Sequence, residues 1–347
     1  MEKTRFLVTD AIERQLISDV PLCTFLSGGL DSSIISTVAR QHIEDLTTYS
    51  VDYHDNDRYF QSGKFQPNSD NQYIEIMHQF LRSNHRRVEL DTPELVLALF
   101  DAVNARDLPG MADVDASMLL LCQSVKHTHT VVLSGECADE IFGGYPWFYR
   151  PELLNRDGFP WSADVSARAA FLSGDVTDRL DLAGYSRARY EETINASPKL
   201  PGESPEEARR RAVGYLNIKW FMQTLLDRMD RTSMYSGLEA RVPFADHRIM
   251  EYVFNVPWSM KYQNGVEKTR TVLDPESFQY ILDERLAVGA KLPNEYELAD
   301  RFGVSRGTIR EAVKLLVSRG VLRVKHGSGT YVASLMPLKA DPLGLDA

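Results

Sequence analysis

The chain has 347 residues, of which 43% are hydrophobic and 25% charged, and its formal net charge is −10. This length exceeds one average domain and the apolar content suffices for a sizeable core, so we expect two globular units and exclude a disordered chain. No apolar run approaches the roughly 20 residues that a membrane-spanning helix needs, and three scattered cysteines exclude a disulfide framework. The sequence therefore predicts a cytoplasmic protein without a membrane partner.

Strand-like and helix-like segments alternate in the first part of the chain. Strands are predicted at 22–27, 46–52, 85–90 and 130–134, and helices at 31–42, 71–82, 93–105 and 116–126. This alternation predicts an α/β fold with a doubly wound parallel sheet, whose ligands bind at the carboxyl ends of the strands. From about 151 to 251 the strand signals fade, which predicts a helical extension of the same domain.

The first predicted strand runs into the heptad SGGLDSS, residues 27–33, and then into a helix. Backbone N–H groups at a helix N-terminus bind phosphate, and Gly28 and Gly29 allow a close approach to the anion. The heptad is neither a Walker loop nor GxGxxG, so simple nucleotide hydrolysis and dinucleotide binding are not favoured. The alternative is a glycine turn with a helix cap, since Asp and Ser are good capping residues.

A second motif, SGECADEIFGGY at 134–145, follows the last predicted strand of this series. It places three carboxylates, Glu136, Asp139 and Glu140, within five residues. Such a cluster is costly unless a cation or a substrate amine compensates the charge, so it favours a site for a metal-nucleotide. The alternative is a solvated acidic start of a helix, which the helix dipole alone would stabilise.

Together these motifs resemble the synthetase domain of glutamine-hydrolysing asparagine synthetases over about residues 2–268. The likeness includes LDRMDRTSM at 226–234, GLEARVPF at 237–244, DHR at 246–248 and EK at 267–268. It implies a sheet of the PP-loop ATP pyrophosphatase type, also called adenine nucleotide alpha hydrolase-like. It also implies an ATP-dependent amide ligase that activates aspartate as a β-aspartyl adenylate, releases pyrophosphate and makes asparagine with ammonia.

The same resemblance implies roles for single residues. ATP binding is implied for Leu26, Ser27, Gly28, Gly29, Asp31, Ser32, Val51, Ser134 and Gly135. Asp31 and Asp139 would bind Mg²⁺, Glu136 would handle the proton when ammonia attacks, and Lys268 would stabilise charge on the transferred phosphate and the acyl intermediate. The family's glutaminase domain has no counterpart near Met1, so ammonia is the expected nitrogen source, and the likeness stops soon after Lys268.

The last part of the chain has a different charge balance, with nine Lys and Arg against four Asp and Glu in residues 285–333. Helices at 289–299 and 306–318 around a turn at 302–305, then strands at 321–324 and 330–332 around a turn at 326–329, predict a small winged helix-turn-helix domain. The alternative is a helical hairpin with a solvated basic face.

This stretch resembles the winged helix of GntR-type regulators, especially the FadR-like branch, over about residues 278–333. The resemblance implies DNA contacts by Ser305, Arg306, Thr308, Arg310, His326 and Gly327. Tyr296 departs from the family, which often has an arginine there. A single winged helix reads one half-site and makes few phosphate contacts, so we expect weak, salt-dependent DNA binding that a homodimer would strengthen.

We therefore predict a synthetase-like domain at 1–270, a winged helix at 271–336 and a tail at 337–347. Three interpretations stay open: an ammonia-dependent ligase with an appended DNA-binding module, a transcriptional regulator whose first domain only senses a nucleotide, and an artificial fusion of two fragments. Glu136 and Lys268 are needed for the first alone. Arg306 and Arg310 are needed for DNA binding.

Overall fold

The computed structural model describes residues 2–59, 70–108, 110, 112–162, 165–170, 172–263, 266–267, 291–294, 296–298, 313, 322–325 and 329–332. Contacts within the chain divide it into a first unit, Met1–Val256, and a second unit, Pro257–Ala347. The predicted boundary between residues 270 and 271 lies outside the described residues and stays a prediction.

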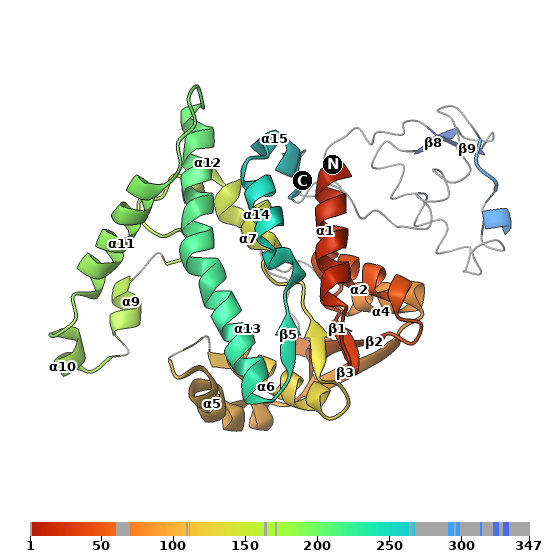
Figure 1. Ribbon diagram of the computed structural model, residues 1–347, viewed down its shortest axis with the longest axis horizontal. Coiled ribbons are helices and arrows are strands. Elements are labelled where there is room, and N and C mark those ends of the chain that lie inside the picture. Colours follow the sequence, from red (N-terminus) through yellow and green to blue (C-terminus); the bar gives the residue numbers. More distant parts are fainter. Residues whose placement is uncertain are drawn as a thin grey trace. The chain divides into compact units, whose positions relative to one another are not determined.

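A five-stranded parallel sheet forms the centre of the first unit, with the strand order β3-β2-β1-β4-β5 (Figure 1). The strands are β1 Leu22–Phe25, β2 Thr47–Tyr53, β3 Asn84–Leu90, β4 Val131–Leu133 and β5 Glu239–Arg241. The predicted α/β fold with a parallel sheet is confirmed. Because the order runs outward from β1 in both directions, the carboxyl ends of β1 and β4 form the switch point where such sheets bind ligands.

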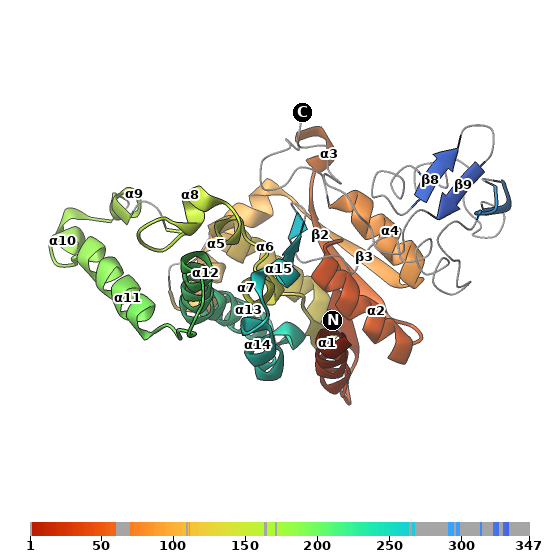
Figure 2. The same ribbon diagram turned by 90° about the horizontal axis from the view of Figure 1, so that it is seen from above.

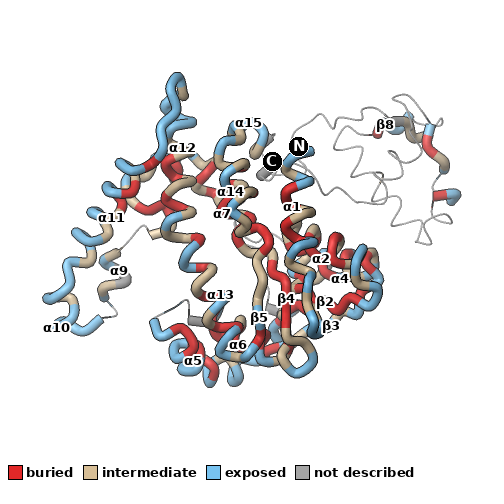
Figure 3. The backbone as a smooth tube through the Cα atoms, in the orientation of Figure 1, coloured by how far each residue is buried: buried red, intermediate tan, exposed pale blue. Residues whose placement is uncertain are grey.

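Helices cover both faces of this sheet (Figure 2). They include α1 Glu2–Gln15, α2 Leu30–His42, α4 Asn71–Leu81, α5 Thr92–Arg106 and α6 Ala112–Lys126, and the short helix α3 Asn56–Tyr59 follows the end of β2. One core cluster joins α1, α2 and α14 (His247–Phe254) to β4, and another joins α6 to β1 and β2. All three residues of β4 are buried between these layers (Figure 3).

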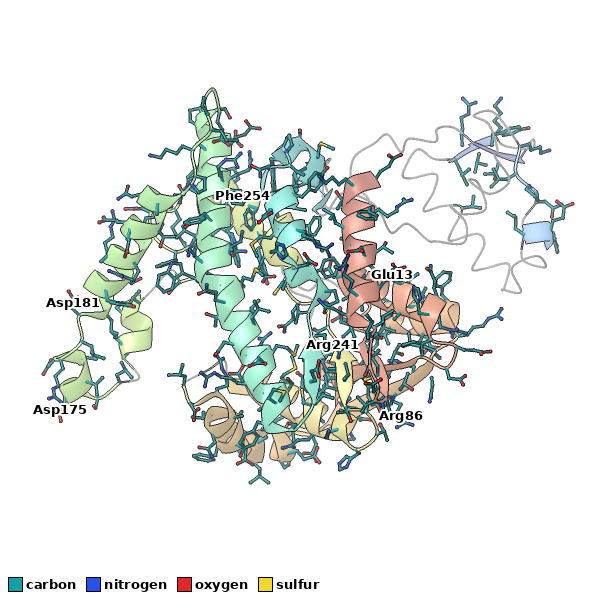
Figure 4. The ribbon with its side chains drawn as sticks, viewed as in Figure 1. Glu13, Arg86, Asp175, Asp181, Arg241 and Phe254 are labelled. Carbon is teal, nitrogen blue, oxygen red and sulfur yellow. The ribbon has the colours of Figure 1, made fainter. Side chains whose placement is uncertain are left out.

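Strand β5 was not predicted from the sequence. Two of its three residues are charged, so it carries no apolar pattern, and its pairing depends on β4. Arg241 on β5 donates to the carbonyl oxygens of Gln15 and Ile17, at 2.6 and 2.7 Å, and so ties the strand to the end of α1 (Figure 4). Tertiary contacts therefore define this strand.

The predicted helical extension is confirmed in the first unit. It comprises α7 Ala138–Phe142, η1 Pro146–Phe148, α8 Pro151–Leu154, α9 Val165–Ala169, α10 Gly174–Thr177, α11 Leu182–Ala196, α12 Pro205–Leu216, η2 Asn217–Met222, α13 Gln223–Tyr235, η3 Pro243–Ala245 and α14. Segments α12, η2 and α13 follow one another directly, and η2 is a π-helix, a form that often occurs at functional sites. Asn217 of η2 is fully buried and donates to the carbonyl oxygen of Glu140 at 3.3 Å.

The second unit contains two antiparallel strand pairs among its described residues. Helix α15 Trp258–Lys261 precedes β6 Tyr262–Gln263 and β7 Val266–Glu267, and β8 Leu322–Lys325 pairs with β9 Gly329–Val332. The last pair matches the strands predicted at 321–324 and 330–332. The predicted helices at 289–299 and 306–318 lie mostly outside the described residues, so the winged helix stays a prediction. Within the described part of the chain, no helix is long and apolar enough to span a bilayer.

Candidate active site

The heptad SGGLDSS forms the turn between β1 and α2. Gly28 has φ +76°, in the left-handed region, and a Cβ there would lie 2.8 Å from Tyr73 Cβ and 2.9 Å from Ile74 N on α4. Only glycine fits this conformation and this close approach. Helix α2 begins directly after Gly29, so its first turn faces the carboxyl end of the sheet, where backbone N–H groups without intrahelical partners attract anions.

Ser32 holds this turn together. Its hydroxyl accepts from the Ser27 N–H at 3.1 Å, donates to the Gly29 carbonyl at 3.1 Å and lies 3.0 Å from the Ser27 hydroxyl. The side chain of Ser32 is buried, whereas Ser27 is exposed. The loop is thus preorganised by internal bonds, and Ser27 is the serine open to a ligand.

The loop after β4 packs directly against this turn. A Cβ on Gly135 would lie 2.8 Å from the Ser32 nitrogen and 3.3 Å from Asp31 Cβ, so the two loops touch through their backbones. Ser134 is buried, and its N–H donates to the Arg241 carbonyl at 2.8 Å. The structure therefore brings together the predicted ATP-binding residues of both loops.

Glu136 follows Gly135 and forms an ion pair with Arg228 of α13. Arg228 Nη2 donates to Glu136 Oε1 at 2.5 Å, and both side chains are mostly buried, with 10% and 16% of their surface exposed. Glu136 Oε2 is buried and has no hydrogen-bond partner among the described residues. Burial raises the pKa of Glu136, the charge and hydrogen bond of Arg228 oppose this rise, and Asp115 adds to it.

The neighbouring Glu140 is also compensated from within the chain. Its side chain is buried, and Tyr145 donates its hydroxyl proton to Oε1 at 2.5 Å. Burial raises the pKa of Glu140 to about 7, while the hydrogen bond from Tyr145 opposes the rise. Glu136 and Glu140 thus have protein partners, Arg228 and Tyr145.

The resemblance also implies that Leu26 and Val51 flank the adenine of ATP, and these residues lie at the end of β1 and on the neighbouring strand β2. Leu26 follows β1 and donates its N–H to Tyr49 of β2 at 2.8 Å, and Val51 lies two residues further along β2. The side chain of Leu26 is fully buried against Ile74, Met77 and Leu81, and Val51 packs against a different cluster. A contact of Leu26 with adenine would therefore involve its backbone.

The donors present fit a magnesium ion that arrives with a nucleotide. Asp31 lies in the first turn of α2 and Asp139 in α7, the helices that follow the two touching loops. No group of three or more His, Cys, Asp or Glu in the described ranges could hold a metal by itself. Magnesium is commonly bound by one or two carboxylates together with substrate phosphates and water. This donor set suits an ion shared with a pyrophosphate group.

Several predicted site residues lie outside the described residues: Lys268, Ser305, Arg306, Thr308, Arg310, His326 and Gly327. Conversely, the charge partners Arg228 and Tyr145 were not among the site residues predicted from the sequence. Arg228 lies within LDRMDRTSM at 226–234, one of the motifs that carry the family resemblance. That motif was the sequence signal from which Arg228 could have been predicted.

The sequence is similar to proteins of one described family. The family described as Asparagine synthase matches residues 3–322. The chain is 51% identical to asparagine synthetase [glutamine-hydrolyzing] 3 of Bacillus subtilis over 269 residues, which cover 76% of this chain and 44% of that protein. It is 25% identical to a putative asparagine synthetase of Mycobacterium bovis over 302 residues, covering 78% and 44%, and 26% identical to the asparagine synthetase of Mus musculus over 275 residues, covering 76% and 37%.

A solved structure described as Streptococcus agalactiae GntR is 52% identical over 20% of this chain and 34% of its own, with a TM-score of 0.18. The chain spans less than half the length of the curated relatives above. The match over residues 3–322, together with 51% identity over three quarters of the chain, shows that the chain belongs to the asparagine synthase family.

Proposed function

We propose that the chain is an ATP-dependent amide ligase that converts aspartate and ammonia into asparagine through a β-aspartyl adenylate. A carboxylate attacked directly by ammonia would have to expel oxide, a very poor leaving group. Attack of the aspartate side-chain oxygen on the α-phosphorus breaks the bond to pyrophosphate and attaches AMP. Ammonia then attacks the acyl carbon, and the bond to AMP breaks.

The turn at residues 27–33 suits the nucleotide. Its exposed Ser27, the glycine backbone and the first turn of α2 face the same edge of the sheet as Gly135. Asp31 and Asp139 would bind Mg²⁺ together with the pyrophosphate group, and the ion would neutralise negative charge on the pyrophosphate. Lys268 would stabilise charge on the transferred phosphate.

The observation that carries this proposal is the Glu136–Arg228 pair. Arg228 occupies Oε1, whereas Oε2 is buried without a partner among the described residues. A buried acceptor without a donor is unfavourable, so Oε2 suits a substrate N–H group. We assign Oε2 to take the proton from the attacking ammonia, since a carboxylate with a raised pKa is a more effective base near neutral pH.

The test is pyrophosphate release by the full chain with ATP, Mg²⁺, aspartate and ammonium. We expect aspartate-dependent release, loss of it in Lys268→Ala, and a 10²- to 10⁴-fold lower ammonium-dependent turnover in Glu136→Gln. Glu136→Gln should keep a single turnover without ammonium, because adenylation precedes the proton transfer.

Glu203→Gln is the matched control. Glu203 is also a buried carboxylate paired with an arginine, Arg211 at 2.8 Å, but it lies outside both loops of the site. It should release pyrophosphate at the rate of the unmodified chain. A folded chain that shows no aspartate-dependent release would overturn the ligase proposal.

DNA binding by the second unit is a second candidate function. We interpret the antiparallel pair β8–β9 as the wing, and it exposes Arg323 and Lys325. These cations suit phosphate contacts. The regulator interpretation would need this binding and would not need Glu136.

A further inference from the structure

A buried arginine joins three helices behind the candidate active site. Arg106, at the end of α5, has 4% of its surface exposed. Its Nη1 donates to Asp115 of α6 at 3.1 Å, and its Nη2 donates to Asp227 of α13 at 3.3 Å. One guanidinium group therefore holds carboxylates of two other helices.

A second arginine ties α13 to the same end of α5. Arg231 donates to Asp227 at 2.6 Å, to the Arg106 carbonyl at 3.2 Å and to Asp107 at 3.3 Å. Asp227 and Arg231 are four residues apart and so lie on one face of the helix. This face of α13 is attached to α5 over a full turn.

Arg228 is the next residue after Asp227 and points in a different direction. Successive residues of an α-helix are about 100° apart around its axis. Asp227 faces Arg106, while Arg228 reaches Glu136. Fixing Asp227 therefore fixes the rotation of α13, and with it the direction of the Arg228 side chain.

Charge gives Arg106 a second effect on the same site. Asp115 is buried, with 2% of its surface exposed, and its negative charge raises the pKa of Glu136. The positive charge of Arg228 lowers that pKa. Arg106 neutralises Asp115 by pairing with it. Buried ion pairs contribute little net stability because removing the charges from water is costly. Stability alone is therefore a weak explanation of this network.

We propose that Arg106 is a positioning residue for Glu136, acting through Asp227 and Arg228 on α13 and through Asp115 on α6. This inference rests on the proposed function, which makes Glu136 the proton acceptor. Charged and titratable groups from three elements interact electrostatically with Glu136. They are Asp115 and Cys122 of α6, Arg228 of α13, and Cys137, Glu140 and Tyr145 in and beside α7.

The test measures the titration of Glu136 in the full chain by ¹³C NMR of labelled glutamate, assigned by the signal missing in Glu136→Gln. Arg106→Gln leaves Asp115 unneutralised and loosens α13. We expect the pKa of Glu136 to rise by about one unit or more. The acidic limb of ammonium-dependent turnover should move to higher pH by the same amount, because the proton acceptor must be ionised.

Charge restoration separates this effect from a packing defect. Adding Asp115→Asn to Arg106→Gln should move the Glu136 titration back toward its original position, and Asp115→Asn alone should lower it. Arg187→Gln is the matched control, since Arg187 also bridges two carboxylates, Asp157 and Glu191, but on the surface. It should leave the titration unchanged.

The outcomes can be distinguished from failure of the ligase proposal. If the chain releases no pyrophosphate, the proposed function fails, while the NMR titration still tests the network. If Arg106→Gln does not fold, Asp115→Asn carries the test alone. An unchanged Glu136 titration in a folded Arg106→Gln or Asp115→Asn chain would overturn the positioning role.

Discussion

Gly28 sets the shape of the nucleotide turn, and an alanine there meets two penalties. Its φ of +76° strains a residue with a Cβ, and that Cβ would press on Tyr73 and on the backbone of Ile74. We expect Gly28→Ala to lower the free energy of unfolding by about 3 kcal/mol and to weaken ATP binding more than tenfold. Urea unfolding and calorimetric titration with ATP measure the two effects.

Gly202 provides the control for this substitution. Its φ is +75°, but apart from its chain neighbours no described residue has an atom within 4 Å of a Cβ placed there. Gly202→Ala should cost only the backbone strain, about 1 kcal/mol, and leave ATP binding unchanged. Equal losses of unfolding free energy in Gly28→Ala and Gly202→Ala would show that the contact of Gly28 with α4 is unimportant.

Sequence patterns identified Glu136 but not the residue that holds it. The carboxylate follows an apolar strand within a short motif, which a linear pattern can show. Arg228 lies 92 positions later, and its role depends on the rotation of α13 against the loop after β4. Such a contact is set by tertiary packing, so the sequence could predict the loops of the site more readily than the charge partners behind them.

At the level of elements, the same limit applies to strands. The observed β2 closely matches the predicted segment because buried β-branched and aromatic residues mark it. Strand β5 has no such mark, and it exists because β4 offers an open edge beside it and Arg241 binds the end of α1. A local sequence pattern predicts a strand when burial determines which residues the strand contains. It fails when the strand forms only because a neighbouring strand pairs with it.

Strands β2 and β3 are linked by His85, which makes their pairing sensitive to acid. Its Nδ1 lies 2.9 Å from the Thr48 hydroxyl, and its Nε2 lies 3.1 Å from the Ser50 hydroxyl. Burial, followed by the charges of His78 and Arg87, lowers the pKa of His85 to about 4. Between about pH 6.5 and 4 the unfolded chain therefore binds a proton that the folded chain does not, and stability falls as the pH falls.

We expect the unmodified chain to lose about 2 kcal/mol more than His85→Gln between pH 7 and 4.5, since glutamine does not titrate. Urea unfolding at a series of pH values measures this difference, and an NMR titration of the His85 ring checks the pKa directly. Parallel stability profiles for the two chains would contradict the assignment.

At the scale of the whole molecule, charge is unevenly distributed. Residues 1–269 contain 28 Lys and Arg against 39 Asp and Glu, a net of −11, and residues 270–347 contain 11 against 10, a net of +1. The larger part of the chain therefore repels a polyanion, and any DNA affinity must come from a local basic surface. We expect binding to a short duplex to be detectable at low salt and to fall steeply as salt rises.

Arg306→Ala with Arg310→Ala tests whether the predicted recognition helix carries this binding. Each lost phosphate contact should reduce the slope of log affinity against log salt by about 0.9, so the pair should reduce it by about 2. Arg187→Ala with Arg189→Ala removes the same charge from α11 in the acidic unit and is the matched control. If both pairs weaken binding equally, net charge alone governs the association and the predicted winged helix has no specific part in it; a loss confined to Arg306 and Arg310 supports a DNA-binding module.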